Sequence, residues 1–203
     1  FDAASVRRYG VGDLIESPAA WTGRELAASN DWIRHLTDDE ITALERVGKR
    51  FVADDPDMRT VQAADYPIPE LSTLLGEISH AVDAGRGFLL VRGLPVHLYA
   101  DALSGAILYV LGLHLGDPMR QNQLGDLLDS VRATSDRTRE EDPYALGSRI
   151  RDALAFHSDA SDLVTLLCLR TSREGGESSL ISSAALLNEF ARRRHFDSRF
   201  ASQ

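Results

Sequence analysis

The stretch FHSDASDLVTLLCLR, residues 156–170, sets a short polar motif directly before a run of apolar residues. The apolar run, residues 163–169, has the length and composition of a buried β-strand. Side chains alternate along an extended segment, so His157 and Asp159 are expected to point to the same side. A neutral imidazole and a carboxylate are two of the three ligands in a 2-His-1-carboxylate site for Fe(II). The stretch therefore predicts a strand and a candidate metal site.

The same His-x-Asp spacing recurs at residues 195–197, in a polar, arginine-rich tail. The first copy is better placed, because it comes before an apolar run and a Gly-Gly turn. Its side chains could therefore line the mouth of a β-barrel, where ligands often bind. Taken on spacing alone, the alternative is a surface His157 that hydrogen-bonds to Asp159.

Composition sets the broad class of the protein. The 203 residues fit one domain, and 43% hydrophobic with 26% charged residues is typical of a soluble globular chain. A formal net charge of -9 argues against a general surface for nucleic acid or anionic membrane. No apolar stretch has the length of a membrane span. The single cysteine, Cys168, allows no disulfide framework, which indicates the cytoplasm, and its place in the apolar run predicts a buried side chain.

The first 85 residues read mainly as helical. Apolar residues recur at helical spacing between residues 21 and 36, with an interruption at residues 29–31. Thr37 and Glu40 form a capping box for a helix that the segment 54–57 ends. The next helix follows Pro67-Ile68-Pro69 and is expected to stop at Gly85 in a left-handed conformation. Two further helices are predicted, over residues 101–115 and 184–194.

In the later part of the chain, the spacing of apolar residues changes from a helical to a strand-like pattern. Strands are predicted at four places, residues 87–93, 127–131, 163–170 and 179–182. Residues 174–177 are expected to form a tight turn, and residues 134–147 a surface loop. Helices followed by strands indicate an α+β fold rather than alternating βαβ units.

Several short motifs accompany the His-x-Asp motif in a fixed order. They are GFLLVRGLP at residues 87–95, LHLGDP at 113–118, Cys168-Leu169-Arg170, Gly175-Gly176-Glu177-Ser178, Ser182-Ser183 and Asn188-Glu189. This series resembles the TauD/TfdA (taurine dioxygenase-like) family of Fe(II)- and 2-oxoglutarate-dependent oxygenases, over residues 17–194. The resemblance implies a double-stranded β-helix, or jelly roll, with flanking N-terminal helices. It divides the chain into a helical N-terminal part, residues 1–85, and the first part of the jelly-roll core, residues 86–203.

The resemblance also implies roles for particular residues. His157 and Asp159 would bind Fe(II), with open positions left for 2-oxoglutarate and O2. Ser178 falls where relatives carry a threonine that hydrogen-bonds the 2-oxoglutarate carboxylate, and its hydroxyl could do the same. Gln121 and Asn122 are candidates to hold substrate or cosubstrate, with hydrogen bonding inside a turn as the alternative. The expected activity is a dioxygenase reaction on an unidentified small molecule.

Two parts of the family pattern have no counterpart in this sequence. The family's distal histidine and its 2-oxoglutarate-binding arginine lie far downstream of Asn188-Glu189, and a jelly roll needs about eight strands. We therefore expect a fragment of a longer oxygenase. The alternatives are a naturally short chain that needs a partner, a degenerate member that acts as a binding subunit, and a cupin-like hydrolase or isomerase with another metal. A homo- or hetero-oligomer is compatible with each.

Overall fold

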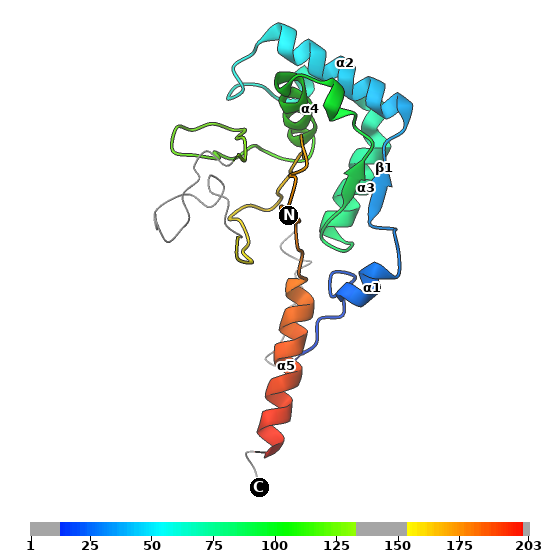
Figure 1. Cartoon of the computed structure of the whole chain (residues 1–203), viewed down its shortest axis with the longest axis vertical. Helices are drawn as coiled ribbons and strands as arrows, with labels where there is room; N and C mark the ends of the chain where they lie inside the picture. Colours follow the sequence, from blue (N-terminus) through cyan, green and yellow to red (C-terminus); the bar gives the residue numbers. More distant parts are fainter. Residues whose placement is uncertain (1–12, 133–153, 201–203) are drawn as a thin grey trace. The chain divides into compact units, whose positions relative to one another are not determined.

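The computed structural model of the chain describes residues 13–132 and 154–200 (Figure 1). The elements in chain order are α1 (Gly23–Ala27), β1 (Ile33–His35), α2 (Asp38–Asp54), η2 (Ala63–Asp65), η3 (Pro69–Leu71), α3 (Ser72–Asp83), β2 (Leu90–Arg92), η4 (Val96–Leu98), α4 (Asp101–Leu113) and α5 (Ser183–Phe200). They fall into two compact units. One comprises the chain up to His35, Gly76–Arg92 and the chain from Ser178; the other comprises Leu36–Leu75 and Gly93–Glu177.

Helix α2 begins and ends where the sequence predicts. The Thr37 hydroxyl accepts a hydrogen bond from the Glu40 amide at 3.2 Å, and the Glu40 carboxylate accepts one from the Thr37 amide at 2.8 Å. This capping box satisfies two amides that the helix itself leaves without partners. At the other end Asp55 takes a left-handed conformation with φ 42, directly before Pro56. Local chemistry therefore fixes both ends of α2.

Helices α2 and α4 enclose the main core. Figure 1 shows α2 lying across α4, and Leu44, Ile107 and Val110 are almost completely buried. Gly48 lets the helices approach closely, because a Cβ there would lie 2.6 Å from Ile107 Cγ1. Among the described residues, every buried apolar side chain except Ile78 belongs to this unit.

The other unit contains a small parallel sheet. Strands β1 and β2 pair with Ile33 opposite Leu90, and β2 confirms the predicted strand over its second half. The expectation of helix through residues 32–36 was wrong, because β1 occupies residues 33–35. A helical pattern in a short segment can be overridden by a partner strand far away in sequence. Here β2 supplies that partner, and the Leu90 amide donates to the Trp32 carbonyl at 2.9 Å.

Helix α5 confirms the helix predicted over residues 184–194 and extends further, to Phe200. The Ser182 hydroxyl accepts from the Ala185 amide at 2.9 Å, which caps its first turn. Asn188 is buried in the same unit, where its side chain accepts from the Ile15 amide at 2.6 Å and donates to the Ile15 carbonyl at 3.0 Å. Among the described residues, none of the helices has the length and apolar character that a bilayer span requires.

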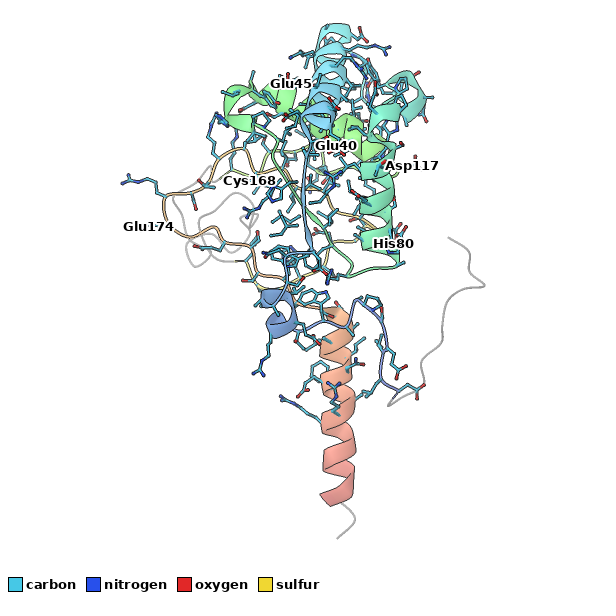
Figure 2. The ribbon with its side chains drawn as sticks, turned by 90° about the vertical axis from the view of Figure 1, so that its right-hand side faces the viewer. Glu40, Glu45, His80, Asp117, Cys168 and Glu174 are labelled. Atoms are coloured by element: carbon cyan, nitrogen blue, oxygen red, sulfur yellow. The ribbon has the colours of Figure 1, made fainter. Side chains whose placement is uncertain are left out.

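Three of the four predicted strands are corrected by the structure. Residues 127–131, 163–170 and 179–182 carry no strand in the part of the chain that is described. Several apolar side chains along these segments are exposed, and Leu166 reaches 78% exposure, whereas the leucines at 127, 128, 163, 167 and 169 are half-buried. Cys168 is also exposed rather than buried, on a coil segment visible in Figure 2. The physical reason is that a strand needs a neighbouring strand for its hydrogen bonds, whereas a helix supplies its own.

Of the two predictions that involve glycines, one was wrong and the other agrees with the structure. Gly85 is not left-handed; its place is set by close packing, because a Cβ there would lie 2.8 Å from the Ala81 carbonyl oxygen. The left-handed residue after α3 is Gly87, with φ 82. The predicted turn at residues 174–177 is consistent with Gly175 and Gly176, which have φ 66 and φ 79. The loop predicted at residues 134–147 lies outside the described residues.

Candidate metal centre

His157 and Asp159 lie close together on a segment without helix or strand, in the unit that contains α2 and α4. The distance from His157 Nε2 to Asp159 Oδ1 is 3.8 Å. Both side chains are more than half exposed, at 57% and 56%. The expectation that residues two apart point to the same side agrees with this geometry. The polar pair is therefore accessible from solvent.

The second ring nitrogen of His157 has a partner of its own. His157 Nδ1 lies 2.8 Å from the Ala155 carbonyl oxygen. A carbonyl oxygen only accepts, so Nδ1 carries the proton in the neutral ring and donates it. The lone pair is then on Nε2, the nitrogen nearer Asp159. A backbone carbonyl behind the ring is the usual arrangement that orients a metal-binding histidine.

The spacing of the two donor atoms suits a single metal ion. Metal bonds of about 2.1 Å to nitrogen and oxygen allow one ion to join atoms up to about 4.2 Å apart. Neighbouring ligands in an octahedral site lie about 3.0 Å apart, so a closure of just under 1 Å completes that geometry. Exposed side chains reach this by small torsional changes. The donor set, one imidazole and one carboxylate, fits Fe(II).

The third ligand is not found beside this pair. Among the side chains that the structure describes, in residues 13–132 and 154–193, no group of three His, Cys, Asp or Glu is arranged to hold a metal ion. Two ligands hold an ion more weakly than three, and they leave more of its coordination positions open. What the described part of the chain presents is two neighbouring donor groups, one imidazole and one carboxylate.

The other predicted site residues lie in different settings. Asn122 closes a turn: its side-chain oxygen accepts from the Leu124 amide at 3.0 Å and its nitrogen donates to the Asp126 carboxylate at 2.7 Å. Gln121 donates from Nε2 to the Met119 carbonyl at 2.9 Å. Ser178 is exposed and belongs to the other compact unit. A common site for Ser178, Gln121 and His157 therefore stays a prediction.

Sequence reasoning did not anticipate a hollow in the unit that contains the sheet. Its volume is about 730 Å³. Trp21, Trp32 and Phe88 form its aromatic wall, with ring centroids 5.4 Å and 5.9 Å from Phe88. His80 of α3, labelled in Figure 2, also lines it. The available signal was the position of both tryptophans within the first 32 residues.

A protein-family model described as "Taurine catabolism dioxygenase TauD, TfdA family" matches residues 53–198, well over half of the chain. The chain belongs to the TauD/TfdA family. The matched range contains His157, Asp159, Ser178 and the Gln121-Asn122 turn. It leaves out Trp21 and Trp32 of the aromatic wall and includes Phe88.

Two curated proteins are similar to the chain. FR-33289 synthase of Streptomyces rubellomurinus is 27% identical over 185 residues, which cover 87% of this chain and 53% of that protein. Taurine hydroxylase-like protein SAT17 of Stachybotrys chartarum is 21% identical over 201 residues, which cover 95% of this chain and 52% of that protein. The chain thus spans about half the length of these relatives. TauD/TfdA membership supports dioxygenase chemistry with iron and 2-oxoglutarate.

Proposed function

We propose that the chain supplies the first metal-binding edge of an Fe(II)- and 2-oxoglutarate-dependent dioxygenase that oxidises a small molecule. The observation that carries the proposal is the His157–Asp159 pair, with 3.8 Å between its donor atoms, inside a range that the TauD/TfdA model matches. The proposal includes a jelly-roll core that begins within residues 86–203, with residues 1–85 as its helical cover.

Each residue of the pair has its own task. His157 would present the Nε2 lone pair, with the Ala155 carbonyl holding the ring from behind. Asp159 would bring a negative charge that offsets part of the charge of the cation. When bound, iron and 2-oxoglutarate supply the O2-dependent oxidation, and the protein supplies binding and orientation.

The cosubstrate contacts belong to the same proposal. The exposed Ser178 hydroxyl can donate a hydrogen bond to a carboxylate such as that of 2-oxoglutarate. Asn122 would have to give up the bonds that close its turn, so Gln121, with its one side-chain bond to the Met119 carbonyl, is the readier donor of the two.

The test uses the natural protein that contains this chain, loaded anaerobically with Fe(II). Succinate formed from 2-oxoglutarate on exposure to O2 is the readout. We expect His157→Ala to lower turnover by at least about 100-fold, because the loss of a first ligand exceeds the 10- to 100-fold cost of losing a supporting partner. His97→Ala is the matched control, since His97 is also exposed and lies on η4.

Two results would contradict the proposal. Turnover that His157→Ala leaves unchanged would remove the pair from the reaction. A protein that binds no Fe(II) and forms no succinate would instead support the non-catalytic binding subunit.

A further inference from the structure

The hollow in the unit that contains the sheet has an aromatic wall whose polar groups already have partners. Trp21 Nε1 donates to the Arg86 carbonyl at 2.9 Å. Trp32 Nε1 donates to the Ser29 carbonyl, also at 2.9 Å. Phe88 packs against both indoles, and all three aromatic side chains are half-buried where they line the hollow. A ligand in the hollow would therefore meet aromatic rings rather than indole N–H groups.

A carboxylate beside this wall has no cation paired with it. Glu25 lines the hollow from α1, whose N-cap directly follows Trp21, and Trp32 Nε1 also donates to the Leu26 carbonyl of α1 at 3.2 Å. Glu25 Oε2 accepts from the amide and the hydroxyl of Thr22 at 2.7 Å and 2.8 Å. These two bonds hold the pKa of Glu25 below its ordinary value, so the carboxyl group is ionised at neutral pH. Its other oxygen, Oε1, has no hydrogen-bond or ion-pair partner among the described residues.

The other charges that line the hollow cancel in pairs. Arg34 Nε lies 2.7 Å from Glu77 Oε2, and Arg86 Nη2 lies 2.5 Å from Asp31 Oδ2. The described lining thus holds three carboxylates and two guanidinium groups, which leaves one negative charge in excess when His80 is neutral. Because both guanidinium groups already have carboxylate partners, the lining favours a cation over an anion.

Two buried polar side chains hold the segment that leads to Trp21. Asn188 accepts from the Ile15 amide at 2.6 Å and donates to the Ile15 carbonyl at 3.0 Å. The Ser182 hydroxyl donates to the Ala19 carbonyl. Both side chains are more than nine-tenths buried, and Pro18, between the two contacts, lines the hollow. This side of the hollow is therefore formed before any ligand binds.

We propose that the hollow binds a small organic ammonium ion with an aromatic body, its nitrogen paired with Glu25 and its body against the aromatic wall. An ammonium group donates up to three hydrogen bonds, which suits the unpartnered Oε1, and aromatic faces attract cations. The volume of about 730 Å³ lies in the range of small-molecule sites. Trp21, Glu25 and Trp32 precede residue 53, where the TauD/TfdA match begins, so this site goes beyond the proposed dioxygenase function.

The test uses the natural protein that contains this chain, labelled with ¹⁵N-tryptophan. Nuclear magnetic resonance follows the indole N–H signals, and Trp21→Phe and Trp32→Phe assign them. The probes are benzylammonium, benzyl alcohol and benzoate, which share one ring and differ in charge, at constant ionic strength. We expect benzylammonium to shift both indole signals with a dissociation constant about threefold to fivefold below that of benzyl alcohol, as one exposed charge pair provides. Benzoate should bind most weakly.

The variants test the carboxylate. Glu25→Gln should remove the preference for benzylammonium over benzyl alcohol, and glutamine can still complete the capping box of α1. Glu40→Gln is the matched control, because Glu40 completes the capping box of α2 in the other unit and does not line the hollow. It should leave the preference unchanged. Butylammonium keeps the charge without the ring and should bind more weakly than benzylammonium.

The results that would overturn the proposal are distinct. Equal affinity of the parent protein for benzylammonium and benzyl alcohol, or no binding of either, overturns it without any variant. A preference that persists in Glu25→Gln removes Glu25 from the site. Butylammonium binding as tightly as benzylammonium removes the aromatic body. None of these results bears on His157 and Asp159, because the assay needs neither iron nor turnover.

Discussion

Helix α4 and the run at residues 163–169 are both rich in apolar residues, yet they reach opposite states. In the helix pair, Leu44 and Ile107 are almost completely buried, whereas Leu166 in the run is 78% exposed. The difference lies in where the backbone hydrogen bonds go. A helix closes its bonds within a few residues and then needs only one apolar face covered. An extended run needs neighbouring strands before it can bury anything.

This contrast bears on the candidate metal pair. His157 and Asp159 lie on the same side of the comparison as Leu166, because both side chains are more than half exposed.

The largest expected difference between the two regions comes from truncating a buried side chain of α4. We expect Ile107→Ala to lower the free energy of unfolding by about 2–5 kcal/mol, because it leaves a cavity between α2 and α4. Leu166→Ala is the matched change on the extended side and should cost less than about 0.5 kcal/mol. Urea denaturation followed by circular dichroism measures both. Similar losses in the two variants would mean that residues 163–169 are packed in solution.

The close approach of the helices gives a second and smaller effect. Gly48→Ala places a methyl group 2.6 Å from Ile107 Cγ1, and we expect this overpacking to cost about 1–3 kcal/mol. Gly76→Ala in α3 is the control, because no atom lies within 4 Å of that Cβ position. It should stabilise by up to about 1 kcal/mol through helix propensity. If both substitutions stabilise in the same denaturation assay, the packing of α2 on α4 is looser than described.

The smallest expected change in stability concerns a side-chain hydrogen bond between Tyr99 and Glu45 of α2. The Tyr99 hydroxyl donates to Glu45 Oε1 at 2.7 Å, and burial, followed by this bond, raises the pKa of Tyr99. Between the unfolded pKa of about 10 and the raised pKa, the folded chain binds more protons than the unfolded chain. The free energy of unfolding should therefore fall as pH rises above about 10. Tyr99→Phe should cost about 1 kcal/mol at neutral pH and flatten that fall.

Denaturation midpoints at pH 9 and pH 11 provide the measurement. Tyr66 and Tyr109 also have raised pKa values, chiefly through burial, so part of the alkaline loss should persist in Tyr99→Phe. An unchanged slope in that variant would show that Tyr99 does not contribute to it.

The elements that could be predicted from sequence are those with local causes. The capping box of Thr37 and Glu40 predicts the start of α2, and Asp55-Pro56 predicts its end. Gly175-Gly176 predicts a turn, and both glycines have positive φ. Residues 32–36 could not be assigned correctly, because β1 depends on pairing with β2 more than fifty residues later. The same reasoning explains residues 163–170, whose length and composition are those of a buried strand but which pair with no strand among the described residues.

For the site, the sequence by itself determined the donor pair. The spacing of His157 and Asp159 predicts that their side chains point to one side, and the order of the surrounding motifs indicates the family. Only the tertiary structure gathered both tryptophans and Phe88 around one hollow, and only it showed that the Ala155 carbonyl holds His157. The reason is physical: side-chain alternation follows from the local backbone, whereas contacts between residues far apart in sequence depend on how the whole chain packs.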